Sequence, residues 1–227
     1  MATQPDDTLD DPEQWIGRSE SRTDLLAAGP VVLLAALLDR HCDSMQAGDA
    51  LSPLAHWLYF LPACRQSQLG QDGHPSGVGL LPAIQPSRRM WASSKVEYLR
   101  PLRLGEPVRR DTKIGDITRK SGRSGPLLFV SLAHTISGQD GKVAISETQQ
   151  LVYRDLKGTH EPARRPREAP AERAWCRRIS PDAPLLFRYS ALTFNAHRIH
   201  YDRRYAAEVE GYPGLVVQGP LIATMLV

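Results

Sequence analysis

The spacing of apolar residues changes near residue 90, and the change divides the chain into a helical part and a strand-rich part. Before residue 90, apolar residues recur at helical spacing. The first such group contains Leu25, Leu26, Val32, Leu33, Ala36 and Leu37. Ser21-Arg22-Thr23-Asp24 resembles a capping box and predicts that a helix begins there. Gly29-Pro30 is expected to end a first short turn and to start a second helix.

A further helix is expected from Ser52-Pro53, because proline fits the first turn of a helix. Leu54, Trp57, Leu58 and Leu61 then give it one apolar face, which Pro62 ends. His56 lies beside this face, where burial and local bonding explain most histidines better than catalysis does. Residues 66–87 are rich in Gly, Pro, Gln and Ser and predict a long loop, of the kind that often serves as a lid or binding element.

From residue 90 the pattern is typical of strands separated by glycine-containing turns. The expected strands cover residues 91–99, 108–119, 126–137 and 143–153. Short turns between them predict an antiparallel meander, and the many charges of the second strand indicate that it faces water or lies at an edge. A helix followed by such a meander predicts an α+β fold, an order that several folds share.

Residues 156–174 are rich in Pro, Arg, Glu and Ala and are interpreted as a linker. A short strand over residues 175–179 is expected to open a second domain, which ends in an apolar helix beginning near Pro220. A helix that is apolar on nearly all sides should be buried. The sequence ends within this helix, so we expect a partner chain or further residues to cover it.

Composition sets broad limits on the class of protein. With 227 residues, 41% hydrophobic and 23% charged, the chain is typical of a soluble globular protein of one or two domains. A net charge of +3 does not favour nucleic acid as a partner but suits an anionic ligand. The N-terminus is acidic and unlike a signal peptide, and no apolar stretch is long enough to span a membrane. Three cysteines with no zinc or redox spacing favour the cytoplasm.

The strongest concentration of chemistry lies in residues 189–202. Two of the seven histidines, His197 and His200, stand three residues apart, and Asn195 precedes them. Eighteen residues after His200 comes Gln218-Gly219-Pro220, which would place Gly219 at the N-terminus of a helix. Such a terminus offers unpaired N–H groups and the positive end of the helix dipole. Acid/base groups beside a backbone anion site suit chemistry next to a carbonyl.

Other interpretations of these residues stay open. The two histidines could be structural, or could bind a metal with Asp202 as a third ligand, although no HExxH pattern is present. A salt bridge or a cap is the favoured role for Asp202. Arg198 is either a surface charge or a bidentate partner of a substrate carboxylate. Basic clusters are expected to be solvated strand faces, or otherwise a patch for phosphates; they contain Arg88, Arg89, Arg100, Arg103, Arg109 and Arg110.

The strings Ser190–Asp202 and Gly211–Pro220 resemble the MaoC-like, hydratase 2 branch of hot-dog-fold enzymes. Within it, they are most similar to 3-hydroxyacyl-thioester dehydratases and mesaconyl-C4-CoA hydratases. The resemblance implies a hot-dog fold, in which an antiparallel sheet wraps a central helix. It further implies a double hot dog: a dehydratase-like domain over residues 12–155, with the helix after Ser52 as its centre, and a truncated second hot dog over residues 175–227.

The resemblance also implies roles for the motif. In the better-known family pattern an Asp comes five residues before a His, and an Asn three before it. His200 matches the His, while Asn195 and His197 stand at the Asp and Asn positions. We expect His200 and His197 to share water activation and proton donation, Asn195 to orient the water or thioester, and the N–H of Gly219 to hold the enolate oxygen. The expected substrate-binding residues are Arg198, Tyr201 and Gln218.

The expected function is reversible addition of water to a 2-enoyl-CoA, with mesaconyl-C4-CoA as the preferred substrate and no cofactor or metal. The alternatives are a dehydratase of fatty-acid synthesis acting on acyl carrier protein, a non-catalytic acyl-CoA-binding subunit and, more weakly, a thioesterase. The expected partners are the acyl-CoA substrate and either further copies of the chain or a partner that completes the second hot dog.

Overall fold

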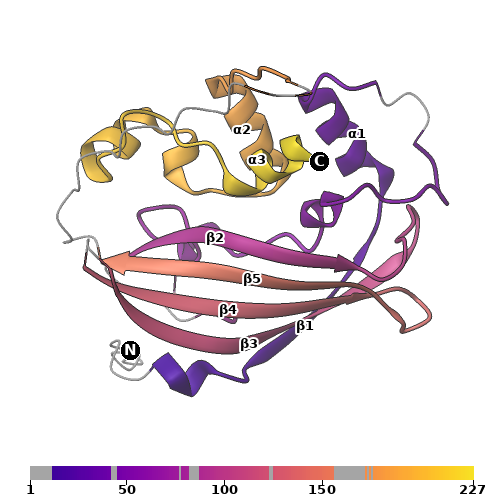
Figure 1. Cartoon of the computed structure of the whole chain (residues 1–227), viewed down its shortest axis with the longest axis horizontal. Coiled ribbons are helices and arrows are strands. Elements are labelled where there is room, and N and C mark those ends of the chain that lie inside the picture. Colours follow the sequence, from indigo (N-terminus) through magenta and orange to yellow (C-terminus); the bar gives the residue numbers. More distant parts are fainter. Residues whose placement is uncertain are drawn as a thin grey trace.

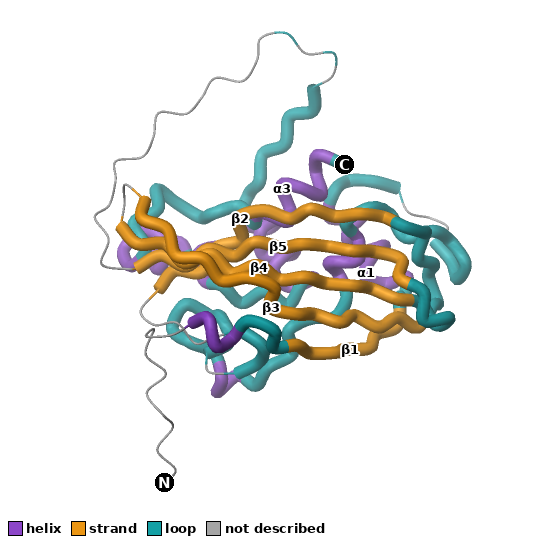
Figure 2. The backbone as a smooth tube through the Cα atoms, turned by 60° about the horizontal axis from the view of Figure 1, so that its bottom comes forward, coloured by secondary structure: helices purple, strands orange, loops and turns teal. Residues whose placement is uncertain are grey.

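The computed structural model describes residues 12–41, 45–76, 78–81, 87–122, 125–155, 172, 174 and 176–227. Its centre is a five-stranded antiparallel sheet in the order β1-β3-β4-β5-β2, with the helices gathered along one face (Figures 1 and 2). The strands are β1 (Ser19–Leu25), β2 (Ser87–Tyr98), β3 (Pro107–Gly122), β4 (Gly125–Ser137) and β5 (Val143–Asp155). The α-helices are α1 (Ala28–Leu37), α2 (Ala183–Leu192) and α3 (Gly219–Leu226). Short helical turns are η1 (Pro12–Trp15), η2 (Ala55–Leu58), η3 (Gln66–Gln68), η4 (Arg198–His200) and η5 (Tyr205–Val209).

The four predicted strands are present, but they do not form one simple meander. Strands β3, β4 and β5 follow one another as hairpins, as predicted. Strand β2 pairs instead with β5, where Trp91 lies opposite Leu151, so between β2 and β3 the chain crosses from one edge of the sheet, past β5 and β4, to the interior position beside β1. Strand alternation predicts that a segment is a strand, but the choice of its partner depends on tertiary packing.

The predicted helix start at Ser21-Arg22-Thr23-Asp24 is wrong, because these residues belong to the edge strand β1. Asp24 accepts hydrogen bonds from the N–H groups of Leu25 and Phe60 and caps no helix. Pairing with β1 makes β3 an interior strand, so the expectation of an edge strand is wrong, whereas one face of β3 does face water, as also expected. Alternate residues of β3, such as Thr112 and Ile114, are buried between the exposed charges.

The helices also differ from the sequence prediction. Gly29-Pro30 lies in the first turn of α1, so one helix forms there and not two. The long helix expected after Ser52 is wrong; it is reduced to the four-residue turn η2, which begins after Leu54 with a φ of 63°. Among the described residues, therefore, no single long helix packs along the sheet. Helices α1, α2 and α3 and the turn η2 cover it together.

One apolar core joins elements from both ends of the chain. Its buried members include Leu34 of α1, Leu58 of η2, Ile136 of β4, Leu186 of α2 and Leu221 of α3. Burial of each such side chain contributes roughly 1.5–3 kcal/mol, so this core fixes α2 and α3 against the sheet. The short strand expected over residues 175–179 is wrong for Cys176–Ile179, which have no regular structure, while Trp175 and most of the predicted linker 156–174 lie outside the described residues.

Helix α3 is only partly buried. Leu221 and Thr224 are buried, whereas Ile222, Leu226 and Val227 are exposed. The sequence predicts that this helix is buried on all sides, but only the face with Leu221 and Thr224 is buried. Within the described part of the chain, no helix is long and apolar enough to cross a membrane.

Candidate active site

A cleft of about 880 Å³ lies between the sheet and the C-terminal segment. Its walls come from three parts of the chain: the strands, the loop around His74, and the segment from α2 to the start of α3. Polar and charged side chains among its lining include Arg22, His56, His74, Arg89, Arg110, His134, Glu147, Asn195, Tyr201 and Gln218. The described part of the long loop predicted over residues 66–87 lines this cleft, and its binding role stays a prediction.

The motif histidine His200 has a defined protonation state. Its Nδ1 lies 2.7 Å from the carbonyl oxygen of Val216. A carbonyl only accepts hydrogen bonds, so Nδ1 carries the proton and Nε2 is left as an acceptor. Burial lowers the pKa of His200 to about 4, which keeps the ring neutral at pH 7. A neutral imidazole with an unprotonated Nε2 is suited to act as a general base.

The structure brings His197 and Asn195 together with His200. The rings of His197 and His200 are 5.3 Å apart, and the side-chain oxygen of Asn195 accepts a hydrogen bond from the backbone N–H of His197. The Nε2 of His197 lies 3.6 Å from the carboxylate of Glu210, which is buried and also pairs with Arg88 at 3.3 Å. Asn195 lines the cleft. His197 and His200 are not among the lining residues and are buried, with 6% and 7% of their surface exposed.

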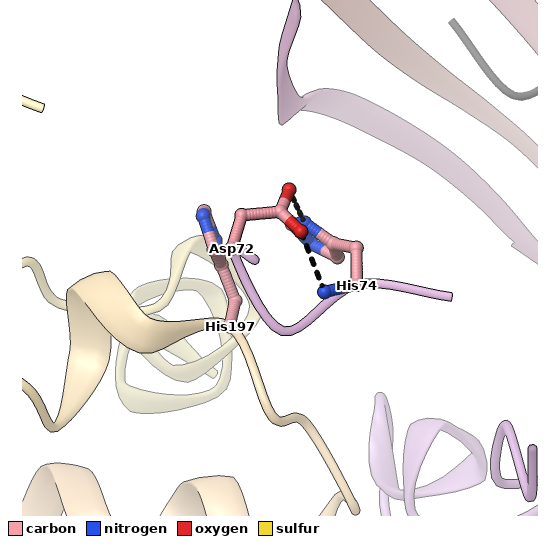
Figure 3. Close-up of side chains that lie close together, drawn as sticks. All are labelled: Asp72, His74 and His197. Atoms are coloured by element: carbon pink, nitrogen blue, oxygen red, sulfur yellow. Dashed lines mark hydrogen bonds and ion pairs between the residues drawn. The ribbon is translucent and has the colours of Figure 1, made fainter. Parts of the chain in front are cut away.

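The loop that contains Asp72 and His74 packs directly on this motif (Figure 3). Asp72 accepts hydrogen bonds from both the backbone N–H and the Nδ1 of His74, each at 2.9 Å. The ring of His74 lies 4.0 Å from that of His197. Burial, followed by the charge of Arg89, lowers the pKa of His74 to about 3. His74 is thus a second neutral imidazole, held by Asp72 and in contact with the motif.

Asp72, His74 and His197 could in principle hold a metal ion. Their possible ligand atoms lie within 4.8 Å of one another. Among the described residues, this is the group of His, Asp, Glu or Cys side chains that is close enough to share a metal ion. Both oxygens of Asp72 already accept hydrogen bonds from His74, and the positive charge of Arg89 is close enough to lower the pKa of that ring. These contacts favour a hydrogen-bonded pair over a set of metal ligands.

Gly219 begins α3, as the sequence predicted, at a point of close packing. A Cβ atom on Gly219 would lie 2.6 Å from Cε3 of Trp91 on β2, so only glycine fits here. Trp91, Gln218 and Pro220 line the cleft around this position. The first N–H groups of a helix have no partner within the helix, so the start of α3 offers donors beside the cleft.

The three predicted substrate-binding residues have different surroundings. Tyr201 lines the cleft, and its hydroxyl donates to the carbonyl of Ala196. Gln218 is 1% exposed; its amide nitrogen donates to Leu186 and Ser190, and its Oε1 has no partner among the described residues. Arg198 is not among the lining residues.

The surroundings of Arg198 explain its position outside the cleft. Its guanidinium pairs with Asp202 at 2.7 Å and lies over the ring of Tyr205. Asp202 also accepts a hydrogen bond from the backbone N–H of Tyr205. The salt-bridge and capping roles predicted for Asp202 are therefore confirmed.

A second polar cluster lies elsewhere on the cleft. His56 is buried, and its Nε2 lies 3.1 Å from Glu147, which also accepts from the indole of Trp57. Burial raises the pKa of Glu147, but its hydrogen bonds, led by that of His56, outweigh this and give a net lowering. This bonding agrees with the structural role predicted for His56.

Sequence reasoning did not single out several residues of this site, among them Asp72, His74, Arg89 as a cleft residue, Glu147 and Glu210. The glycine-rich loop around His74 was a signal for a binding element. Nothing in its local pattern shows that it would contact the motif about 120 residues away.

The fold and the site together define a class. An antiparallel sheet with helices on one face is shared with HtdX of Mycobacterium tuberculosis, with a TM-score of 0.58, 18% identity and coverage of 92% of this chain and 74% of that one. A protein described as a MaoC-like dehydratase gives a TM-score of 0.57 with 13% identity, over 92% and 75% of the two chains. The chain therefore has the α+β hot-dog fold that was predicted.

Sequence comparison gives the family within this class. Residues 54–227 match the family of hydroxyacyl-thioester dehydratase type 2 proteins. The chain is 49% identical over 213 residues to mesaconyl-C(4)-CoA hydratase of Chloroflexus aurantiacus, covering 93% of this chain and 75% of that protein. It is 29% identical over 230 residues to the mitochondrial hydroxyacyl-thioester dehydratase type 2 of Schizosaccharomyces pombe, covering 89% and 76%. The chain belongs to the hydroxyacyl-thioester dehydratase type 2 family, which confirms the resemblance drawn from its motif.

Proposed function

We propose that this protein is a hydro-lyase that adds water reversibly to a 2-enoyl-CoA, with mesaconyl-C4-CoA, which gives citramalyl-CoA, as its preferred substrate. The observation that carries the proposal is the 49% identity to a mesaconyl-C(4)-CoA hydratase over 93% of the chain. The neutral His200, which is bonded to Val216 three residues before the start of α3, supports it, because hydration needs a base and donors for an enolate oxygen.

In the proposed mechanism, Nε2 of His200 takes a proton from water as the oxygen attacks the β-carbon of the thioester. The electrons of the double bond move to the thioester oxygen, and the N–H of Gly219 at the start of α3 holds the resulting enolate. The imidazolium, or His197 beside it, then donates a proton to the α-carbon. Asn195 orients the water or the thioester from the cleft wall. No metal or organic cofactor takes part in these steps.

The second candidate is dehydration of a 3-hydroxyacyl thioester in fatty-acid synthesis. The 29% identity to a hydroxyacyl-thioester dehydratase favours it, though more distantly. The same residues would serve, since dehydration is the reverse of hydration. A long acyl chain and a short branched diacid need different pockets, so activity across a substrate panel separates the two candidates.

We also propose a cytoplasmic location and an assembly of more than one chain. Cys64 is a free thiol, which suits a reducing compartment. Part of the apolar surface of α3 is exposed, which suits contact with another chain. Division into a first hot dog over residues 12–155 and a partial second over residues 175–227 is likewise our proposal.

The test of the function is hydration of a panel of 2-enoyl-CoA thioesters, including mesaconyl-C4-CoA, by the purified protein. His200→Ala should lower kcat by about 10²–10⁴-fold, the usual contribution of a general acid–base group. The control is His41→Ala, since His41 is exposed and does not line the cleft. Hydration within a few-fold of the wild type in His200→Ala would show that another residue is the base.

A further inference from the structure

Arg89 on β2 is a cation in the cleft without a carboxylate partner. Most of the arginines that the structure pairs with carboxylates lie outside the cleft, among them Arg88, Arg100, Arg109, Arg198 and Arg204. Arg22 lines the cleft but pairs with Glu20 at 3.0 Å. Arg89 and Arg110 line the cleft, and neither lies within 4.0 Å of a carboxylate among the described residues. A guanidinium in a cleft without such a partner is suited to bind an anionic ligand.

Three observations place Arg89 between the two halves of the proposed site. It lies opposite Tyr153 in the pairing of β2 with β5. Its charge lowers the pKa of His74, whose ring lies 4.0 Å from that of His197. Two residues along the strand, Trp91 contacts Gly219 at the start of α3. Arg89 is therefore near both the acid/base cluster and the proposed oxyanion site.

This position matches the chemistry of a particular class of thioester. In mesaconyl-C4-CoA the free carboxylate is attached to the β-carbon, where water adds. If the thioester oxygen binds at Gly219 and the β-carbon faces the histidine motif, the free carboxylate must lie close to Gly219 and to the motif. A planar guanidinium can hold both of its oxygens through two parallel hydrogen bonds.

We propose that Arg89 binds the free carboxylate of a dicarboxylic acyl thioester and thereby selects diacid over monoacid substrates. This inference rests on the proposed function and specifies its substrate class. A monoacid thioester would leave the guanidinium without an anion in a partly dehydrated site. A polar group left unpaired in this way is a strong source of discrimination between similar substrates.

The test measures binding of two unreactive thioesters that differ at one end. Succinyl-CoA carries a carboxylate on the β-carbon, and butyryl-CoA carries a methyl group there. Arg89→Gln should weaken succinyl-CoA binding by about 10- to 100-fold, the range expected for hydrogen bonds to a charged group, and should change butyryl-CoA binding less than about 2-fold. Arg89→Lys should lose less than Arg89→Gln, because it keeps the charge without the paired donors.

The matched control is Arg110→Gln, which removes the same charge from the same cleft. Arg110 lies opposite Arg22 in the pairing of β3 with β1, and its guanidinium is 4.9 Å from the ring of Phe60. The Arg110→Gln substitution should change the binding of succinyl-CoA and of butyryl-CoA by the same factor. Equal losses of both ligands in Arg89→Gln, or unchanged succinyl-CoA binding in a variant with wild-type unfolding temperature, would overturn the inference.

Turnover separates this inference from the proposed function. If the wild type binds succinyl-CoA through Arg89 but hydrates no thioester, the carboxylate site stands and the hydratase proposal fails. If the wild type hydrates crotonyl-CoA and prefers it to mesaconyl-C4-CoA, the hydratase proposal stands and the carboxylate site is overturned.

Discussion

Three histidines, of which His134 and His200 are buried and His74 is half-buried, are held neutral in the folded protein. Burial lowers the pKa of His74 to about 3, and the pKa of both His134 and His200 to about 4. An unfolded chain would hold these rings near the ordinary histidine pKa of about 6.5. Between these values the unfolded state binds more protons than the folded state, so stability must rise with pH.

We therefore predict that the free energy of unfolding falls as the pH is lowered from about 6.5 towards 4. Above pH 6.5 the contribution of these histidines is fully present. Each pKa unit corresponds to about 1.4 kcal/mol, so the loss amounts to several kcal/mol. Urea unfolding at closely spaced pH values measures it, and His134→Gln should reduce the slope. A stability that is greatest below pH 5 would contradict the prediction.

At the scale of single residues, the sequence predicts those members of the candidate site that lie near one another in the chain. Asn195, His197 and His200 fall within six residues, so any local structure keeps them close, and the structure does bring them together. His74 and Arg89 could not be assigned to the same site. Their position depends on a loop docking and on a strand pairing, and neither leaves a mark in the local sequence.

At the scale of elements, the loop around Gly73 and the motif depend on a close approach. Gly73 has a φ of +89°, and a Cβ atom there would overlap the carbonyl of Ala196. Arg198 donates from its backbone to Asp72 across the same contact. The motif is therefore supported by a loop that only glycine allows to dock.

Gly73→Ala should cost roughly 1–3 kcal/mol of stability through backbone strain and should lower hydration at least 10-fold, because the loop must leave the motif. Gly17→Ala is the matched control: its φ is +86°, a Cβ there meets nothing within 4 Å, and Gly17 does not line the cleft. The control should show a comparable cost in strain with hydration near the wild type. Equal activity in the two variants would show that docking of the loop does not matter.

The start of α3 provides a second test at this scale. Gly219→Ala should push α3 away from Trp91 and move its first N–H groups, which should lower kcat by about 10²-fold, as the loss of an oxyanion donor does. Gly29→Ala, in the first turn of α1 with open space around it, is the control. Combining Gly219→Ala with Trp91→Leu should restore part of kcat. No recovery, together with an unchanged KM, would argue against this packing as the cause.

The elements themselves were predicted to different degrees. Strands β2 to β5 follow from alternation and glycine turns, and their predicted limits agree with the structure to within about four residues. Strand β1 was missed because Ser21-Arg22-Thr23-Asp24 has the local pattern of a helix cap, while pairing with β3 decides its conformation. The helix predicted after Ser52 is longer than the turn η2 that forms there. The apolar spacing of this segment reflects burial of its side chains and not a long helix.

At the scale of the whole molecule, apolar side chains remain exposed on the helical layer. Ile222 and Leu226 of α3 are 45% and 82% exposed. Exposed apolar surface of this kind is typical of contacts between proteins.

We predict that a second copy of the chain covers this surface in solution. Light scattering during size-exclusion chromatography should give a mass above the 25.2 kDa of one chain. Leu226→Lys should shift the protein towards the monomer, whereas a substitution at exposed Lys120, on the sheet, should not. A monomer at every concentration tested would contradict this prediction.

The cleft has a consequence for the order of folding. Its parts lie far apart in the chain, with Gly73 meeting Ala196, and Trp91 meeting Gly219, each across more than 120 residues. The hairpins of β3, β4 and β5 close short loops and can form early, whereas contacts between distant residues form slowly because closing a long loop costs entropy. On the ribosome the sheet can therefore be complete before the motif has been synthesised. Catalytic competence would then be the last property that the chain acquires.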